Sequence, residues 1–175
     1  ENRRAHDAFL REVTFLLRDL SLAEVAGDPV IVERARAYAR EEEIMLDHIH
    51  KNRRLVEGDG DGEIYLVDTT SFYSPVRLDK KLIGLVEPRA RCYVEIKPVF
   101  RGGQKTHDLS VSISLALSMQ RTAHSKDVGE IMRELNIGDG HKGAAAGVQR
   151  CSSAHEFQRA REELPKRIFG IWSNL

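Results

Sequence analysis

The sequence contains little cysteine, which argues against two classes of protein. Only two cysteines, Cys92 and Cys151, occur among its 175 residues, and they form no Cys-x-x-Cys pair. Disulfide-dependent secreted domains carry many more cysteines, and structural zinc sites need closely spaced thiolate pairs. We therefore expect neither a disulfide framework nor a thiolate zinc site, and we expect an intracellular protein, cytoplasmic or nuclear.

The sequence also lacks long apolar runs and an excess of charge of one sign. No apolar run approaches the ~20 residues needed to cross a bilayer, and the N-terminal segment lacks the apolar core of a signal peptide. Lysine plus arginine and aspartate plus glutamate each total 27. Dedicated nucleic-acid binders are usually basic overall, so we expect any such role to be local. We expect a soluble chain with no membrane span.

Apolar residues are plentiful enough for one core. Hydrophobic residues make up 41% of the chain, and its length is ordinary for a domain. We therefore expect residues 1–175 to form a single domain. Because the first residue is Glu1 rather than Met, we also expect a chain that has been trimmed, processed or cut from a longer polypeptide.

Apolar residues at three- and four-residue spacings predict two helices in the first part of the chain. The first stripe comprises Phe9, Leu10, Val13, Leu16, Leu17 and Leu20. Asp28 followed by Pro29 is a typical helix start, because the carboxylate caps the first turn and proline has a suitable φ angle. The second helix is expected to run from there to the basic residues near Lys51.

Four β-rich runs follow and predict a sheet. They cover residues 63–70, 78–86, 91–100 and 109–119. In the last run large apolar residues alternate with serine and alanine, which is typical of a strand with one apolar face. Arg101-Gly102-Gly103 is a flexible connection, so the last two runs are expected to form a hairpin. The alternative is a helix over 108–120, capped by Asp108.

The chain after the last predicted strand is expected to form C-terminal helices. Ser125 is expected to cap a short helix that ends near Gly138, and residues 138–147 read as a mobile loop. This loop spells G-x-G-x-x-G, but it follows a helix, so the dinucleotide-binding context is missing. A capping box from Ser153 to Glu156 opens a last helix that Pro165 is expected to interrupt. The apolar C-terminal tail should then pack on the core or on a partner.

These elements predict an α+β fold. It consists of two N-terminal helices, a mostly antiparallel sheet of about four strands, and two or three C-terminal helices.

One loop resembles an EF-hand calcium loop. The segment that begins at Glu57 places Asp59, Asp61 and Asp68 at loop positions three, five and twelve, with glycine at position six. The resemblance implies Ca²⁺ as a ligand. The sequence after Asp68 does not look like the helix that leaves an EF-hand, and a solvated Asp-Gly turn between strands is the alternative.

A second constellation resembles the core of the PD-(D/E)xK nucleases. Glu95 and Lys97 lie two apart on a predicted strand and so share one face, and Asp79 precedes the neighbouring run. The resemblance implies that Asp79 and Glu95 ligate Mg²⁺ or Mn²⁺ and that Lys97 orients water or stabilises the transition-state charge. The alternative is an ordinary same-face charge pair.

The chain between residues 77 and 105 is locally basic. It holds eight lysines or arginines and three acidic residues, a net charge of +5. Such a strip, with Tyr93 as an aromatic ring, is able to bind phosphates and a base, and it equally suits an acidic protein surface or a second copy of the chain. The likeliest contact residues are Arg89, Arg91, Tyr93, Lys97 and Arg101.

No complete catalytic constellation stands out, so the leading hypothesis is a non-enzymatic binding or assembly domain. Its basic sheet face and apolar tail are expected to contact RNA, DNA, an acidic protein or another copy of the chain. The alternative hypothesis is the divalent-metal-dependent nuclease built on Asp79, Glu95 and Lys97.

Overall fold

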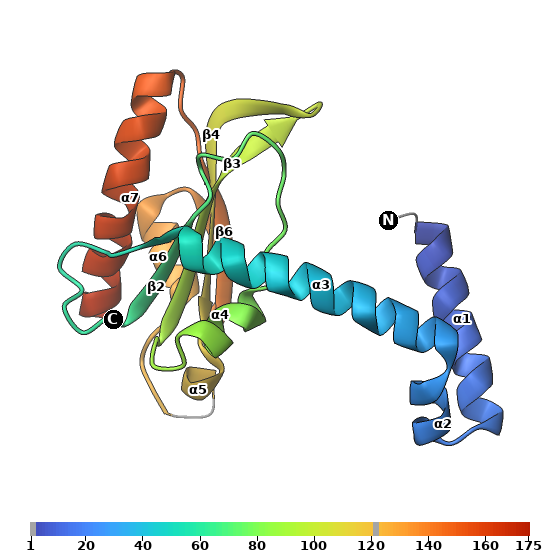
Figure 1. Cartoon of the computed structure of the whole chain (residues 1–175). Coiled ribbons are helices and arrows are strands. Elements are labelled where there is room, and N and C mark those ends of the chain that lie inside the picture. Colours follow the sequence, from blue (N-terminus) through green and yellow to red (C-terminus); the bar gives the residue numbers. More distant parts are fainter. Residues whose placement is uncertain (1–2, 121–122) are drawn as a thin grey trace. The chain divides into compact units, whose positions relative to one another are not determined.

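A computed structural model of the chain describes residues 3–120 and 123–175 (Figure 1). The chain divides into two compact units, Glu1–Ile44 and Met45–Leu175. The fold is α+β, as the sequence predicts. Within the described part of the chain, no helix is both long and apolar enough to cross a membrane.

The first unit is helical. It contains α1 (Arg3–Asp19), α2 (Leu22–Gly27) and the first part of α3 (Pro29–Lys51). The predicted start of α3 is confirmed, since the Asp28 carboxylate accepts a hydrogen bond from the Val30 amide at 2.9 Å. The short helix α2 was not predicted. Ser21 and Glu24 form a capping box at its start.

The second unit is built on a six-stranded mixed sheet with the order β1-β2-β3-β4-β6-β5. The strands are β1 (Arg53–Arg54), β2 (Ile64–Asp68), β3 (Cys92–Arg101), β4 (Gln104–Leu115), β5 (Gly138–His141) and β6 (Ala144–Gln149). Only the pairing of β2 with β3 is parallel among these strands. The predicted hairpin of β3 and β4 is confirmed, and the sheet has more strands than the four expected.

Four further helices surround this sheet in the described residues: α4 (Lys80–Val86), α5 (Leu117–Gln120), α6 (Val128–Leu135) and α7 (Ala154–Asn174). Helices α6 and α7 contact each other, and both pack on the sheet (Figure 1). Ile168 and Trp172 of α7 are fully buried in the core. The apolar C-terminal tail therefore packs on the core and does not present these side chains to a partner.

The predicted strand over 78–86 was wrong, because this segment forms helix α4. Asp79 is the residue that decides it. Its carboxylate accepts a hydrogen bond from the Lys81 amide at 2.9 Å and so caps the first turn. Leu82 and Ile83 are then buried on the side of the helix that faces the core. The short apolar run over residues 82–86 satisfies either a strand or a short helix, and the cap favours the helix.

Helix α6 begins later than predicted. Asp127, not Ser125, caps it, with its carboxylate accepting from the amides of Gly129 at 2.8 Å and Glu130 at 3.3 Å. The helix ends at Asn136, which adopts the left-handed conformation that terminates helices.

The predicted mobile loop over 138–147 was also wrong, because these residues form the hairpin of β5 and β6. Glycine makes this possible through close approach of the two backbones. A Cβ atom on Gly138 would lie 2.1 Å from the carbonyl oxygen of Ala146. Val148 is the one strand-forming side chain of this hairpin, and β6 gains further stability from pairing with β4.

Pro165 does not interrupt the last helix, which runs unbroken through α7. A proline inside a helix leaves the carbonyl four residues earlier without its usual donor. In this chain that carbonyl belongs to Arg161, and it accepts a hydrogen bond from the Arg54 guanidinium at 3.3 Å. A side chain from β1 therefore replaces the missing amide.

Candidate ligand-binding face of the sheet

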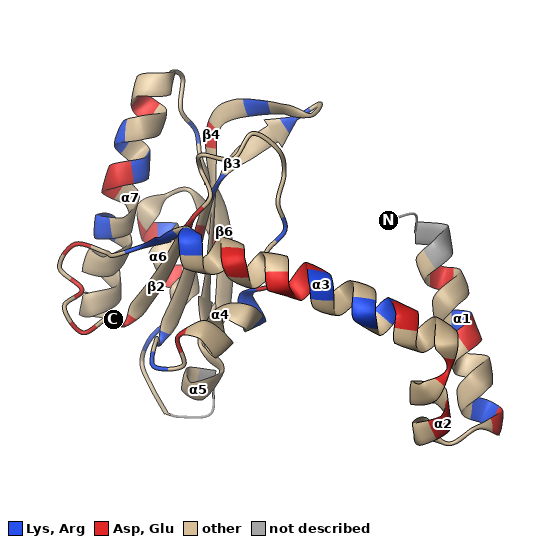
Figure 2. Cartoon of the chain, viewed as in Figure 1, with Lys and Arg blue, Asp and Glu red and all other residues tan. Residues whose placement is uncertain are grey.

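Strand register gathers polar and small side chains on one face of the sheet. Residues paired across β3, β4 and β6 form three rows on this face, which we call the serine face. The rows are Tyr93–Ser114–Ala144, Glu95–Ser112–Ala146 and Lys97–Ser110–Val148. The opposite face carries the buried apolar residues of the same strands, including Val94, Ile96, Val111 and Ile113. The central strands are mostly uncharged (Figure 2). Glu95 and Lys97 are charged residues in the middle of β3.

Glu95 and Lys97 form an ion pair on the serine face. The Lys97 ammonium lies 3.1 and 3.2 Å from the two carboxylate oxygens of Glu95. Ser112 donates a hydrogen bond to the same carboxylate at 3.3 Å. Glu95 is only 4% exposed, whereas the Lys97 side chain is 36% exposed. The carboxylate is thus enclosed, and the ammonium remains within reach of a ligand.

Lys80, near the start of α4, interacts electrostatically with this ion pair. Burial lowers the pKa of Lys80 below its ordinary value, the charge of Glu95 opposes that effect, and the charge of Lys97 adds to it. The partly exposed ammonium of Lys97 is the group of the ion pair that is available to a bound anion.

The middle of the serine face carries only short side chains. Ala146 lies beside Ser112, and Ala144 lies beside Ser114. The Ser114 hydroxyl is buried and has no hydrogen-bond partner in the described part of the chain. Beyond β6, β5 forms the edge of the sheet, where His141 is exposed.

A cavity of about 490 Å³ opens at the Lys97 end of the serine face. It is lined by Thr69, Phe72, Ser74, Pro75, Val76, Lys97, Pro98, Val99, Phe100, Ser110 and Val148. Lys97, Ser110 and Val148 belong to both the cavity and the serine face. The charged site and a mainly apolar hollow are thus continuous.

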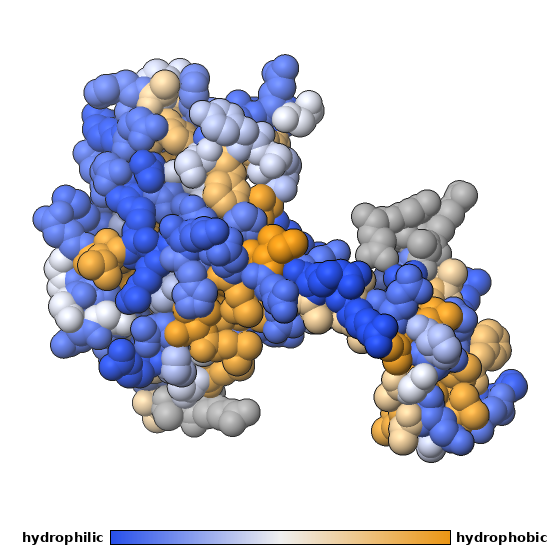
Figure 3. Space-filling model, viewed as in Figure 1, coloured by the Kyte–Doolittle hydropathy of each residue, from blue (hydrophilic) through white to orange (hydrophobic). Residues whose placement is uncertain are grey.

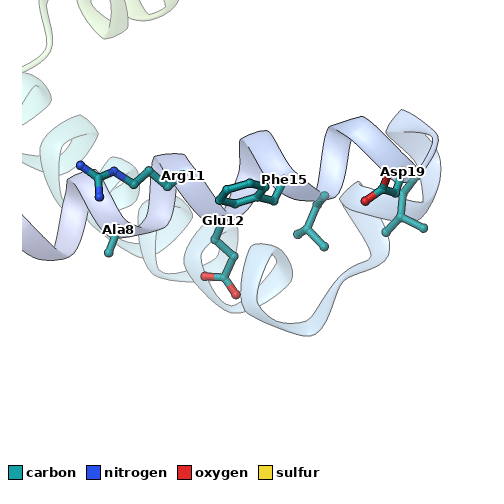
Figure 4. A pocket seen from close by; sticks show the side chains of 7 residues that line it. Ala8, Arg11, Glu12, Phe15 and Asp19 are labelled. Atoms are coloured by element: carbon teal, nitrogen blue, oxygen red, sulfur yellow. The ribbon is translucent and has the colours of Figure 1, made fainter.

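A second hollow lies in the helical unit, along α1 (Figure 4). Its volume is about 680 Å³, and all of its lining residues come from α1 and the residue after it. Phe15 is 62% exposed beside it. Apolar side chains also gather on the surface around α4 and α5 (Figure 3), where Leu85 and Leu117 are 70% and 64% exposed.

The structure brings together two of the five predicted contact residues. Tyr93 and Lys97 share the serine face, but Tyr93 is only 7% exposed and its hydroxyl lies close to Gly84 of α4. Arg91 instead pairs with Glu63, which also accepts a hydrogen bond from Trp172.

The other two predicted contacts lie elsewhere. Arg89 is exposed in the turn after α4 and contacts Glu87 at 3.3 Å. Arg101 lies at the end of β3 and pairs with Asp108 at 2.9 Å. Arg150 binds the same carboxylate oxygen at 2.9 Å. These arginines stabilise local structure and do not extend the serine face.

The residues of the nuclease resemblance are only partly adjacent. Glu95 and Lys97 form the ion pair described above, whereas the Asp79 carboxylate caps α4. The described residues include no group of three or more His, Cys, Asp and Glu side chains placed to hold a metal ion.

The residues of the calcium-loop resemblance are engaged separately. Asp59 accepts hydrogen bonds from the amides of Glu63 and Ile64 at 2.9 and 2.8 Å, as in a tight turn. Asp68 is buried and pairs with Arg54 at 2.7 Å and Arg161 at 2.8 Å. Glu57 pairs with Lys166.

Sequence reasoning missed Lys80 and the alanines of β6 as parts of the site. The signal for Lys80 was weak, because its run was read as a strand and its position depends on how α4 packs. The signal for the alanines was the alternation Ala144, Ala146, Val148, which the glycine-rich composition concealed.

Comparison with known proteins finds likeness in fold alone. No protein-family model matches the chain, and no curated protein sequence matches it either. The structure is similar to a pGpG-specific phosphodiesterase, PggH from Vibrio cholerae, with a TM-score of 0.74 and 15% identity. The match covers 97% of this chain and 53% of that one, so this chain spans about half the length of the phosphodiesterase.

Two further solved structures are less similar. An exopolyphosphatase-related protein from Bacteroides fragilis matches with a TM-score of 0.48 and 12% identity, over 99% of this chain and 46% of its own. The C-Ala domain of Aquifex aeolicus alanyl-tRNA synthetase matches with a TM-score of 0.36 and 15% identity, over 65% of this chain and 97% of that domain. Both TM-scores are too low to support an inference about this chain. The chain therefore shares the fold of about half of a bacterial phosphodiesterase.

Proposed function

We propose that this chain binds a short phosphorylated nucleotide on its serine face. In this proposal it is the ligand-binding half of a phosphodiesterase-type protein, and another domain or chain supplies the groups that break the phosphoester bond. The observation that carries the proposal is the partly exposed Lys97 ammonium, which the Glu95 carboxylate holds beside a row of serine hydroxyls.

The chemistry of the site suits a phosphate group. Ammonium groups donate charge-assisted hydrogen bonds to phosphate oxygens, and serine hydroxyls donate neutral ones. Glu95 holds Lys97 on the serine face and leaves it partly exposed. The β6 neighbour of Ser112 is the small side chain of Ala146.

The likeness in fold supports the same proposal. The similar phosphodiesterase is described as pGpG-specific, and pGpG is a phosphorylated dinucleotide. This chain matches about half of that protein's length. The leading sequence hypothesis, a binding domain for nucleic acid through a sheet face, is kept here in a narrower form with a different set of residues.

A calorimetric titration with pGpG tests the proposal. Replacing Lys97 alone would leave the Glu95 carboxylate buried without its cation, which destabilises a protein. The test variant is therefore the double substitution Glu95→Gln with Lys97→Met. The matched control is Lys166→Met, which removes an ammonium group from α7 that pairs with Glu57.

We expect the double variant to weaken pGpG binding about tenfold or more, since a hydrogen bond to a charged group contributes ~1.5–3 kcal/mol. The control should bind like the unaltered protein. Binding should also weaken with added salt, because ions screen the attraction between the ammonium groups and the phosphates. Equal affinity of the double variant and the control would reject the serine face as the site.

A second proposal retains the nuclease hypothesis, because Glu95 and Lys97 are adjacent. In that case Asp79 and Glu95 would hold Mg²⁺ or Mn²⁺, and the chain alone would cleave labelled single-stranded RNA or DNA. The test is a denaturing gel with Mn²⁺ or with chelator. Cleavage that needs Mn²⁺ and disappears in Glu95→Ala would favour this proposal over ligand binding.

A further inference from the structure

The cavity at the Lys97 end of the serine face differs in character from the serine face itself. Most of its walls are apolar. Two phenylalanines, two prolines and three valines line it, namely Phe72, Phe100, Pro75, Pro98, Val76, Val99 and Val148. Its polar groups include the Lys97 ammonium and the Ser110 hydroxyl, both shared with the serine face. Its volume of about 490 Å³ falls within the range of ordinary ligand pockets, roughly 300–1,000 Å³.

We propose that this cavity is a slot for the base of the nucleotide whose phosphate lies beside Lys97. The inference rests on the proposed function and adds to it the part of the ligand that the cavity would hold. Aromatic and aliphatic walls favour a flat, unsaturated ring, which gains from stacking and from leaving water. The ammonium at the boundary places the charged end of the ligand outside the apolar walls, on the serine face.

The first part of the wall, residues 69–72, is held in place before any ligand arrives. The Thr69 amide donates to the Ile96 carbonyl at 2.9 Å, so the segment begins as an extension of the sheet. The Phe72 amide donates to the Thr69 carbonyl at 3.1 Å, which closes a turn. The ring of Phe72 meets the His48 ring edge-on, with centroids 5.1 Å apart. A preformed wall lowers the entropy that binding would cost.

The opposite wall comes from the strand β3 and its irregularity. The register of β3 against β4 shifts between Pro98 and Phe100. Such a bulge bends a strand and redirects its side chains. Val99 and Phe100 both line the cavity as a result of this local geometry. The slot therefore forms from two segments that are distant in sequence, and Lys97 lies at its boundary with the serine face.

The test compares three probes by calorimetry: ribose 5-phosphate, guanosine 5′-monophosphate and guanosine. The variants are Val148→Phe, which fills the cavity from β6, and Glu95→Gln with Lys97→Met, which removes the charged pair. A matched control, Val30→Phe, adds the same ring to an exposed position of α3 in the helical unit. Circular dichroism and thermal unfolding establish that each variant is folded before binding is measured.

We expect guanosine 5′-monophosphate to bind about tenfold or more tightly than ribose 5-phosphate, because stacking of one base contributes ~1–3 kcal/mol. Val148→Phe should remove this difference, whereas Val30→Phe should leave it intact. If both phosphates bind equally to the unaltered protein, or if Val148→Phe leaves the difference intact, the base slot is refuted.

The two proposals fail in different ways. If the serine face binds no phosphate, the Glu95→Gln, Lys97→Met variant will bind guanosine 5′-monophosphate as well as the unaltered protein does. Guanosine, which has no phosphate, would then still bind in the slot and would still be excluded by Val148→Phe. If the slot is wrong and the serine face is right, both phosphates will bind equally, and the charge variant will lose both.

Discussion

Lys97 binds Glu95 through both carboxylate oxygens while Glu95 itself is almost completely buried. The lysine is thereby fixed on the sheet at the boundary between a row of hydroxyl groups and an apolar cavity. The same carboxylate also weakens the positive charge that a phosphate would meet. Glu95 therefore lowers the expected affinity for an anion and at the same time fixes the position of the Lys97 ammonium.

The first prediction follows from this pairing. Glu95→Gln removes a negative charge near the site, while the amide oxygen still accepts a hydrogen bond from Ser112. If the serine face binds an anion, affinity for pGpG should rise about tenfold, which corresponds to ~1.4 kcal/mol, because one repulsive interaction is gone. Calorimetric titration measures it. A fall in affinity would indicate that Glu95 contacts the ligand or a metal directly.

The second prediction concerns Asp68, which joins β2 to β1 and α7. Its side chain is 1% exposed, and it pairs with Arg54 and Arg161, with Thr70 as a further donor. Asp68→Asn leaves both guanidinium groups without their shared charge. We expect the free energy of unfolding to fall by about 3 kcal/mol, as for a broken buried ion pair. Chemical denaturation measures the change.

A matched control for Asp68→Asn is available in α3. Asp47 pairs with Lys51 one helical turn away at 2.8 Å, and both side chains are exposed. Exposed pairs contribute little, so Asp47→Asn should cost less than about 1 kcal/mol. If both substitutions lower the free energy of unfolding by the same amount, the buried ion pairs of Asp68 do not stabilise the contact of β2 with β1 and α7.

The third prediction is a pH dependence. Burial alone would raise the pKa of Asp68, but the hydrogen bonds of Thr70 and Arg54 and the charge of Arg161 outweigh it and hold that pKa below its ordinary value. A lowered folded-state pKa contributes stability above the unfolded-state pKa of ~3.9, and this contribution is lost as the pH falls through the folded-state pKa.

The measurement is the difference in unfolding free energy between the unaltered protein and Asp68→Asn. This difference should be constant from pH 7 to about pH 5 and should shrink below about pH 4. A difference that stays constant down to pH 3 would show that the Asp68 carboxylate gains nothing from its partners in the folded state.

The fourth prediction tests the hairpin of β5 and β6. Gly138→Ala would place a methyl group 2.1 Å from the Ala146 carbonyl oxygen, against backbone that cannot give way without separating the strands. We expect a loss of about 2 kcal/mol or more in unfolding free energy.

Gly170→Ala is the control for Gly138→Ala. Nothing lies within 4 Å of a Cβ at Gly170, which is inside α7. Alanine has the higher helix propensity, so this substitution should stabilise the protein by about 1 kcal/mol. Thermal unfolding should show a lower melting temperature for Gly138→Ala and a higher one for Gly170→Ala. A neutral Gly138→Ala would contradict close pairing of β5 with β6.

The sequence allowed prediction of the elements whose signals are local. The β3–β4 hairpin has alternating side chains and a glycine turn between its strands, and the same alternation placed Glu95 and Lys97 on one face. The strands β5 and β6 could not be predicted in this way, since alanine and glycine have low strand propensity. Pairing of β6 with β4, and of β5 with β6, stabilises them.

The site was harder to predict than the fold because its members meet through tertiary packing. The electrostatic interaction of Lys80 with Glu95 and Lys97 depends on the position of α4, and no spacing in the sequence encodes that position. In the sequence, basic residues such as Arg91 and Arg101 looked as available for ligand binding as Lys97 did. Their acidic partners, Glu63 and Asp108, become visible only in the structure.

The most direct measurement is to map pGpG binding by amide chemical shifts in the ¹⁵N-labelled protein of 19.8 kDa. Binding on the serine face predicts that the largest shifts on titration fall on β3, β4 and β6, at Lys97, Ser110, Ser112, Ala146 and Val148. Shifts confined to the outer surface of α7 or to the helical unit, or no shifts at millimolar pGpG, would contradict the proposed site.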